Sequence, residues 1–117
     1  MTEAWVETQV LDGRVCIELS GEIDLDNAAA VQEEINAVVG NEVAAVVVDL
    51  TRLSYLDSAG LRVLFQLGER MRVLQMELEL VVPSRSPVRR VIELSGLSPV
   101  ARMLFDDPPP PRGWGVP

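Results

Sequence analysis

The sequence predicts a single α/β domain with a small mixed sheet and the element order β-β-α-β-α-β-α. The pair Asp12-Gly13 separates two strand-like runs, which is typical of a two-residue hairpin because both turn residues tolerate a positive φ. Residues 43–50 are apolar on both faces until Asp49, as in a central, usually parallel strand. Residues 25–39 repeat apolar side chains at helical spacing, which predicts a helix with one buried stripe.

The first half of the chain begins with two predicted strands, over residues 4–11 and 14–20. In the second strand apolar residues alternate with smaller or polar ones, which indicates one core face and one wetter face. Asp24 then stands where a helix N-cap is expected, and Leu25 is the first residue of the apolar stripe. Gly40 is expected to end this helix as a C-cap.

The second half continues the alternation of helix and strand. A helix is predicted over residues 58–74 and a strand over residues 76–82. A third helix starts with Pro87 near its first position, where the missing N–H costs nothing, and Gly96 stops it. Residues 97–105 are expected to form a short final strand or turn. The first hairpin is therefore antiparallel and the remaining strands are mainly parallel.

The length and composition fit one domain followed by a tail. The chain has 117 residues and is 48% hydrophobic, which is enough to bury a substantial core. The composition changes at Asp106, and four consecutive prolines that favour extended polyproline II follow. We expect a domain over residues 1–105 and a Pro-rich, disordered tail over residues 106–117.

The charge and the missing residue types exclude several function classes. A formal net charge of −8 repels phosphate backbones, so nucleic-acid binding is not expected. The chain has no His and no Lys, which excludes Ser–His nucleophiles, Schiff bases, P-loops and His-based metal sites. No cofactor or metal is predicted. The acidic N-terminus shows no signal pattern or membrane span, and the single Cys16 forms no internal disulfide, so a cytoplasmic protein is expected.

The segment 46–61 carries the candidate site. It begins as an apolar strand and ends as the start of a helix, with a short polar stretch that finishes in Asp-Ser-Ala-Gly. The first turn of a helix has unpaired N–H groups and a positive dipole end. On local chemistry alone Ser58 is most simply a helix N-cap. If Ser58 is phosphorylated, the phosphate can accept bonds from the same N–H groups and adds about −1.5 to −2 charges without unfolding the chain.

The residues around Ser58 affect how a phosphate and a partner are accommodated there. Asp57 repels a phosphate on Ser58, and Arg62 one helical turn along partly offsets that repulsion. Gly60 is expected to leave the surface without side-chain bulk, so that a partner can approach. Ser54 is expected in a loop and Asp49 at a strand end, where it bonds nearby backbone.

Four segments together resemble the STAS-domain family of anti-sigma factor antagonists. They are Gly21-Glu22-Ile23-Asp24 after a strand, Val46-Val47-Val48-Asp49-Leu50, Leu53-Ser54-Tyr55-Leu56-Asp57-Ser58-Ala59-Gly60-Leu61, and Ser95-Gly96-Leu97. The resemblance covers residues 5–105, nearly the whole predicted domain. It implies a single STAS-type domain that acts by binding a partner and is not an enzyme.

The resemblance also implies a switch. In this family the serine of the Asp-Ser-x-Gly motif is phosphorylated by a partner that is both a serine kinase and an anti-sigma factor. Carried over, the unphosphorylated chain binds that partner and frees the sigma factor, phosphorylation of Ser58 blocks binding, and a metal-dependent serine phosphatase resets the protein. Family members often have a second hydroxyl after this serine, whereas this chain has Ala59, which leaves one acceptor in the motif.

The strand-end loops and the helix start converge in the predicted topology, which defines an expected binding surface. The chain is expected to be a monomer or a weak dimer. The expected partner-binding residues are Asp24, Ser54, Asp57, Ser58, Gly60 and Arg62.

Two other function classes fit parts of the sequence. An enzyme would use the carboxylates of Asp24, Asp26, Asp49 and Asp57 as a Mg²⁺ site or an acid–base pair. Asp49 could be a phosphoacceptor as in receiver domains, but those domains also need a lysine and an acidic pair after the first strand, and this chain has neither. A STAS-type sensor or adaptor would instead bind a nucleotide or other anion at the helix N-terminus, or serve as a subunit of a larger signalling or transport complex.

Overall fold

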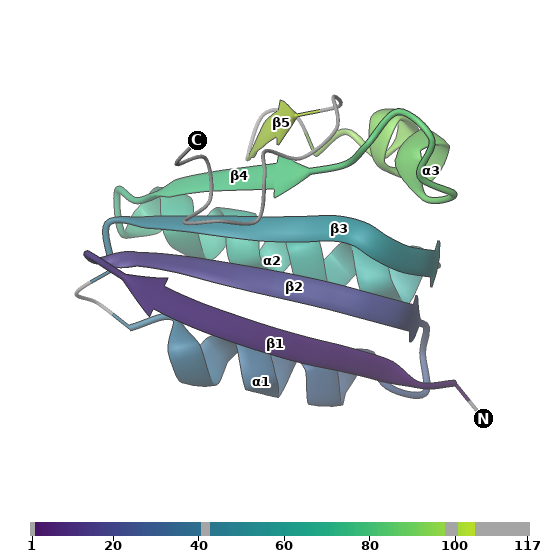
Figure 1. Cartoon of the computed structure of the whole chain (residues 1–117), viewed down its shortest axis with the longest axis horizontal. Coiled ribbons are helices and arrows are strands. Elements are labelled where there is room, and N and C mark those ends of the chain that lie inside the picture. Colours follow the sequence, from purple (N-terminus) through teal and green to yellow (C-terminus); the bar gives the residue numbers. More distant parts are fainter. Residues whose placement is uncertain (1, 41–42, 98–100, 105–117) are drawn as a thin grey trace.

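A five-stranded mixed sheet forms the centre of the molecule in this computed structural model, which describes residues 2–40, 43–97 and 101–104 (Figure 1). The strand order is β1-β2-β3-β4-β5; β1 and β2 are antiparallel and the other neighbours are parallel, which confirms the predicted mixed topology. The strands are β1 (Ala4–Leu11), β2 (Arg14–Ile23), β3 (Ala45–Leu56), β4 (Glu77–Val81) and β5 (Arg102–Leu104). The helices are α1 (Ala28–Val38), α2 (Ser58–Val73) and α3 (Arg89–Leu94).

The β1–β2 hairpin closes through the predicted two-residue turn. Asp12 and Gly13 have φ values of 52° and 75°, and Leu11 pairs with Arg14 across the turn. Both turn residues therefore occupy the left-handed region that the Asp-Gly pair tolerates.

The central strand β3 lies between β2 and β4, as predicted from its apolar run. It is longer than expected, because its pairing with β2 continues through irregular register to the last pair, Ile23 and Leu56. Its pairing with β4 ends earlier, at Asp49 and Val81. The predicted strand end at Asp49 is therefore wrong, since the pairing with β2 extends the strand to Leu56.

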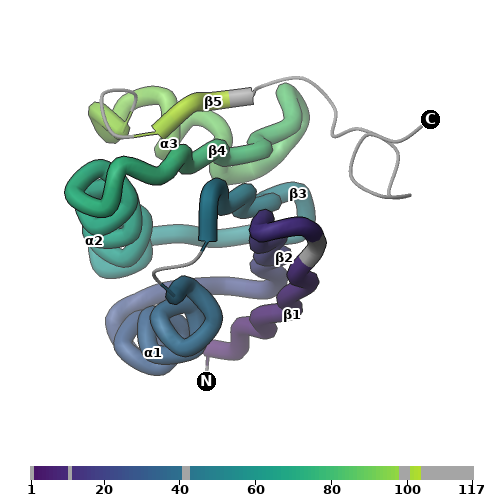
Figure 2. Tube along the Cα trace, turned by 90° about the vertical axis from the view of Figure 1, so that its left-hand side faces the viewer, coloured from purple at the N-terminus to yellow at the C-terminus, as the bar shows by residue number. Residues whose placement is uncertain are grey.

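Helices α1 and α2 cover one face of the sheet, and among the described residues no helix covers the other face (Figure 2). Strand residues that face these helices are fully buried, among them Ile17, Val48 and Leu80. The alternate residues Cys16, Val47 and Val81 form a separate buried cluster. The carboxyl ends of the parallel strands β2 and β3 lie at the same edge of the sheet, and α2 begins at that edge.

Helix α1 begins at Ala28, three residues later than the apolar spacing indicates. Residues 25–27 form a turn instead, and Leu25 is 81% exposed rather than part of the buried stripe. The helix starts after Asn27, because this N-cap residue has non-helical backbone angles, with φ −122° and ψ −1°. Gly40 follows the helix, but its φ lies outside the left-handed region and Val39 is the C-cap.

The C-terminal part of the described chain follows the prediction with shifted bounds. Helix α3 starts at Arg89 rather than next to Pro87, because a turn precedes it in which the Ser86 hydroxyl accepts a bond from the N–H of Val88. Gly96 follows the C-cap residue Ser95 and has a φ of 82°, the left-handed conformation that commonly ends a helix. The predicted short last strand is β5. The expected tail over residues 106–117 lies outside the described residues.

Within the described ranges, every helix is too short or too polar to cross a membrane.

Candidate functional site

The start of α2 is capped by Asp57, not by Ser58. The Asp57 carboxylate accepts hydrogen bonds from the N–H groups of Ala59 at 2.9 Å and Gly60 at 3.1 Å. Asp57 has an extended backbone, as an N-cap residue does, and Ser58 is the first helical residue. The interpretation of Ser58 as a cap is therefore wrong, because the preceding carboxylate already occupies the position from which a side chain reaches those donors.

Ser58 lies on the surface with a free hydroxyl. Its side chain is exposed and makes no hydrogen bond to another described residue. That a phosphate on Ser58 can accept bonds from the first-turn N–H groups stays a prediction. In the unmodified chain Asp57 holds the N–H groups of Ala59 and Gly60, so such a phosphate would compete for them with a carboxylate of the same charge sign.

Gly60 is buried, which contradicts the expectation that it clears space for a partner. A Cβ at this position would lie 2.3 Å from Leu56 Cδ1 and 3.1 Å from Ile23 Cγ2. Gly60 thus faces inward, and its missing side chain lets α2 approach the ends of β2 and β3. The missing side chain therefore serves internal packing, and a partner contact of Gly60 stays a prediction.

Asp24 organises a turn and does not cap α1. Its carboxylate accepts bonds from the N–H of Asp26 at 2.9 Å and from the Thr2 hydroxyl. The Asn27 side chain completes the turn: its oxygen accepts from the N–H of Asp24 at 3.0 Å, and its amide donates to the carbonyl of Glu22 at 2.9 Å. Sequence reasoning missed Asn27, although Asn and Asp side chains commonly bond nearby backbone in turns.

Ser54 and Arg62 take different places around this edge. Ser54 lies within β3 rather than in a loop, and its hydroxyl donates to the carbonyl of Gly21 at 2.9 Å. Gly21 needs the absence of a side chain, because its φ is 87° and a Cβ would lie 2.4 Å from the Glu3 carbonyl oxygen. Arg62 is exposed in α2 one turn after Ser58 and forms no ion pair with another described residue.

The structure brings three expected site residues together at one point. The N–H of Asp57 donates to the carbonyl of Ile23 at 3.3 Å, so Asp24 follows β2 where Asp57 and Ser58 follow β3. Figure 1 shows β2 and β3 ending at the same edge of the sheet. Exposed Ser58 and half-buried Asp24 and Asp57 therefore share one rigid surface.

The acidic residues do not assemble into a metal site. Among the described residues, no group of three or more His, Cys, Asp or Glu side chains is arranged to hold a metal ion. Asp49 lies within β3, well before Asp57, and its carboxylate accepts bonds from the N–H of Thr51 at 2.9 Å and from the Thr51 hydroxyl. The expectation that Asp49 bonds nearby backbone is confirmed.

Comparison with known protein families finds a match to the STAS domain over residues 6–107. The chain belongs to the STAS domain family. It is 37% identical over 93 residues to the Mycobacterium tuberculosis protein described as anti-sigma-F factor antagonist RsfB. The aligned residues cover 80% of this chain and 75% of that protein. A crystal structure of an anti-sigma factor antagonist from Mycobacterium paratuberculosis superimposes with a TM-score of 0.76 at 31% identity over 87% of this chain and 86% of that chain.

The unphosphorylated anti-sigma factor antagonist SpoIIAA shares the fold, with a TM-score of 0.70 at 23% identity over 86% of this chain and 89% of that chain. The STAS resemblance and the STAS-type fold that the motifs predicted are thus confirmed.

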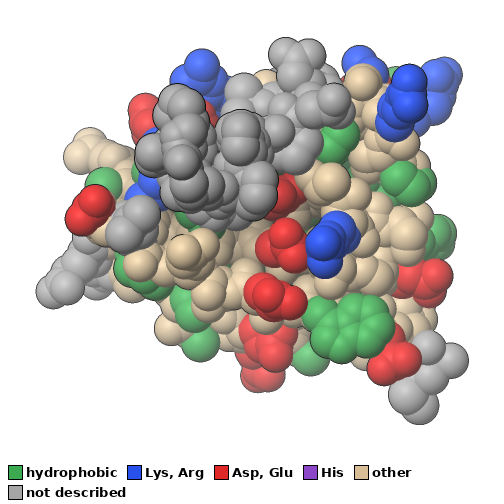
Figure 3. Space-filling model, viewed as in Figure 1, with side chains coloured by type: hydrophobic (Ala, Val, Ile, Leu, Met, Phe, Trp, Pro, Cys, Tyr) green, Lys and Arg blue, Asp and Glu red, His purple; other side chains and the backbone are tan. Residues whose placement is uncertain are grey.

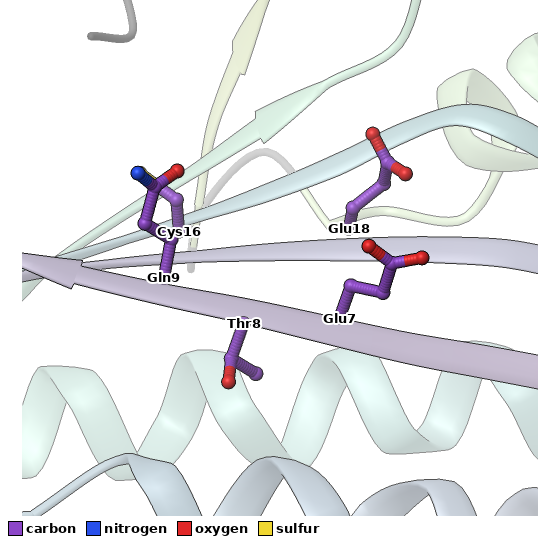
Figure 4. Close-up of a pocket in the computed structure, with 5 residues that line it drawn as sticks. All are labelled: Glu7, Thr8, Gln9, Cys16 and Glu18. Atoms are coloured by element: carbon purple, nitrogen blue, oxygen red, sulfur yellow. The ribbon is translucent and has the colours of Figure 1, made fainter.

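The helix-free face of this STAS domain carries acidic side chains (Figure 3). A shallow hollow over β1 and β2 is lined by Glu7, Thr8, Gln9, Cys16 and Glu18. Figure 4 shows Thr8 pointing toward the helices and the other four away from them. Burial raises the pKa of the Cys16 thiol, the charge of Asp49 acts in the same direction, and Arg14 opposes both. None of the five lining residues belongs to the Ser58 edge.

Proposed function

We propose that this STAS domain is an anti-sigma factor antagonist whose binding is gated by phosphorylation of Ser58. The observation that carries the proposal is the Ser58 hydroxyl, which is exposed, free of described hydrogen bonds and held at the first residue of a capped helix. The relatives that match most of the chain are described as anti-sigma factor antagonists, which supports the same partner class.

The proposed partner is an anti-sigma factor with serine kinase activity. The Ser58 oxygen attacks the γ-phosphorus of ATP held by that partner, the bond to the β-phosphate oxygen breaks, and the hydroxyl proton passes to a base on the kinase. The products are phosphoserine 58 and ADP. This chain supplies the acceptor and no catalytic group, so it is a binding module and not an enzyme.

The modification blocks rebinding through local charge and bulk. A phosphate adds about −1.5 to −2 charges beside the Asp57 carboxylate, at a spot where the N–H groups of Ala59 and Gly60 are already bonded. A kinase that holds a nucleotide presents phosphates of its own to this spot, so the two anions repel at close range. Arg62 offsets only part of this repulsion. A serine phosphatase restores the binding form, and all these partners act in the cytoplasm.

The alternative of an anion sensor has less support. A nucleotide phosphate or other anion at this helix N-terminus would need the N–H donors that Asp57 occupies, and would have to approach its carboxylate. A role as a subunit of a larger signalling or transport complex uses the same surface and differs in the identity of the partner.

The test compares Ser58→Ala, Ser58→Glu and Ser84→Ala, the last of which removes another exposed serine. Each purified variant is titrated by biolayer interferometry, with ADP present, against each purified anti-sigma factor of the organism that encodes the chain. Wild type, Ser58→Ala and Ser84→Ala should bind one of them, and Ser58→Glu should bind weakly. Intact-mass measurement after incubation with the anti-sigma factor that binds and with ATP should show one phosphate on wild type and none on Ser58→Ala. Equal binding by Ser58→Ala and Ser58→Glu would reject the switch.

A further inference from the structure

Leu25 is the most exposed large hydrophobic side chain in the part of the chain that the structure describes, at 81% exposure. It makes no contribution to the core, although its spacing matches the buried stripe of α1. A polar residue would serve equally well in this turn, since the hydrogen bonds of the turn use Asp24 and Asn27. An exposed leucine of this kind marks a contact surface when it belongs to a larger apolar area.

The turn that carries Leu25 is held rigidly. Asp24 and Asn27 together make side-chain bonds to the N–H of Asp24, the N–H of Asp26 and the carbonyl of Glu22. The Asp24 carbonyl accepts from the N–H groups of Asn27 at 3.3 Å and Ala28 at 2.9 Å. Leu25 is thus presented on a preorganised turn, so its burial by a partner needs little further ordering of the backbone.

Leu25 and Ser58 follow the same end of the paired strands β2 and β3. Ile23 and Leu56 are the last register partners of β2 and β3. Leu25 comes two residues after Ile23, and Ser58 comes two residues after Leu56. A second exposed apolar side chain, Tyr55, pairs in register with Glu22 next to this point and is 50% exposed. The edge thus carries the phosphoacceptor, an exposed leucine in the turn after β2 and an exposed tyrosine in β3.

The residues next to Leu25 and Ser58 in the chain are acidic. Asp26 is exposed directly after Leu25, Glu22 is exposed before the turn, and Asp24 before Leu25 and Asp57 before Ser58 are half-buried. The Asp26 carboxylate accepts no hydrogen bond from another described residue. A complementary surface therefore needs an apolar pocket surrounded by cationic side chains.

We propose that Leu25 is the apolar anchor of the partner-binding surface, an inference that rests on the proposed function. It inserts into an apolar pocket of the anti-sigma factor, whose rim carries Arg or Lys side chains that face Asp24 and Asp26. Ser58 then lies beside the anchored contact, close to the kinase nucleotide. Burial of Leu25 supplies binding energy. Phosphorylation of Ser58 prevents the partner from holding Leu25 in this way.

The test uses wild type, Leu25→Ala, Leu25→Met and the control Val73→Ala. Val73 is 74% exposed at the last residue of α2, which lies at the opposite edge of the sheet. Against the purified anti-sigma factor that binds wild type with ADP, Leu25→Ala should bind about 10- to 100-fold more weakly, mainly through faster dissociation. Leu25→Met should bind nearly as tightly as wild type, and Val73→Ala should have the same affinity as wild type. Thermal unfolding should not distinguish the four proteins by more than a few degrees, because both positions are exposed.

The outcomes separate the two proposals. If wild type binds none of the anti-sigma factors, the proposed function fails and the anchor fails with it. If wild type binds and Leu25→Ala binds equally, only the anchor is rejected. Loss of self-association in Leu25→Ala, with unchanged partner affinity, would assign Leu25 to a contact between two copies and also reject the anchor. Asp26→Asn should slow association and reduce its salt dependence, and an unchanged association rate would reject the cationic rim.

Discussion

The backbone N–H of Asp57 donates to the carbonyl oxygen of Ile23 at 3.3 Å and ties the start of α2 to the end of β2. The contact continues the β2–β3 pairing by one residue beyond Leu56. Ser58 therefore begins its helix from a fixed point on two strands. A switch built here changes the charge of a rigid surface, and this leads to four expectations.

Gly60→Ala should destabilise the domain by about 1–3 kcal/mol, because its Cβ would overlap Leu56 and crowd Ile23 in the packed core. The free energy of unfolding in urea measures the effect. Gly40→Ala is the matched control, since a Cβ there meets no atom within 4 Å and φ is ordinary. The inward role of Gly60 is contradicted if both variants unfold at the same urea concentration.

Asp57→Ala should cost about 0.5–2 kcal/mol of stability, since the N–H groups of Ala59 and Gly60 lose their acceptor. Asp57→Asn should recover most of that loss because the amide oxygen can still accept. Asp26→Ala removes a carboxylate from the same edge without a described side-chain hydrogen bond, and should be nearly neutral. Equal losses for Asp57→Ala and Asp26→Ala would mean that charge, not capping, stabilises the helix start.

Phosphorylation of Ser58 should leave the far-ultraviolet circular dichroism unchanged, because Asp57 keeps its cap bonds and the phosphate lies outside them. Stability should fall slightly at low ionic strength, where the phosphate and the Asp57 carboxylate repel most strongly, and should recover as salt screens them. The unmodified chain in the same buffers is the control. A large loss of helix signal would show that the modification acts by unfolding α2.

The Cys16 thiol should react slowly with a disulfide reagent in the folded protein and rapidly in denaturing urea, since burial raises its pKa above the usual 9.0. The folded state then holds its proton more tightly than the unfolded state. Stability from this group is complete below pH 9.0 and falls as the pH rises through the raised pKa. Cys16→Ala should remove that alkaline loss. Rapid reaction in native buffer would contradict the burial of the thiol.

The candidate site was predictable where chemistry is local to the chain. Ser58 stands out because a small hydroxyl follows an apolar strand and precedes an amphipathic helix. The role of Gly60 was not predictable, because glycine is compatible both with an open surface and with a tight internal contact. The position of Leu25 was predicted wrongly, since its spacing fits a helix face and the turn set by Asp24 and Asn27 removes it from that face.

The sequence by itself determined the order of strands and helices, the hairpin at Asp12-Gly13, the central place of β3 and the motif that contains Ser58. These follow from apolar periodicity and turn chemistry, which act over a few residues. Only the tertiary structure decided that Asp57 caps α2, that Gly60 faces Ile23, and that Leu25 reaches solvent. Those outcomes depend on how β2 and β3 end against α2, and contacts between distant segments leave no periodic signal in the chain.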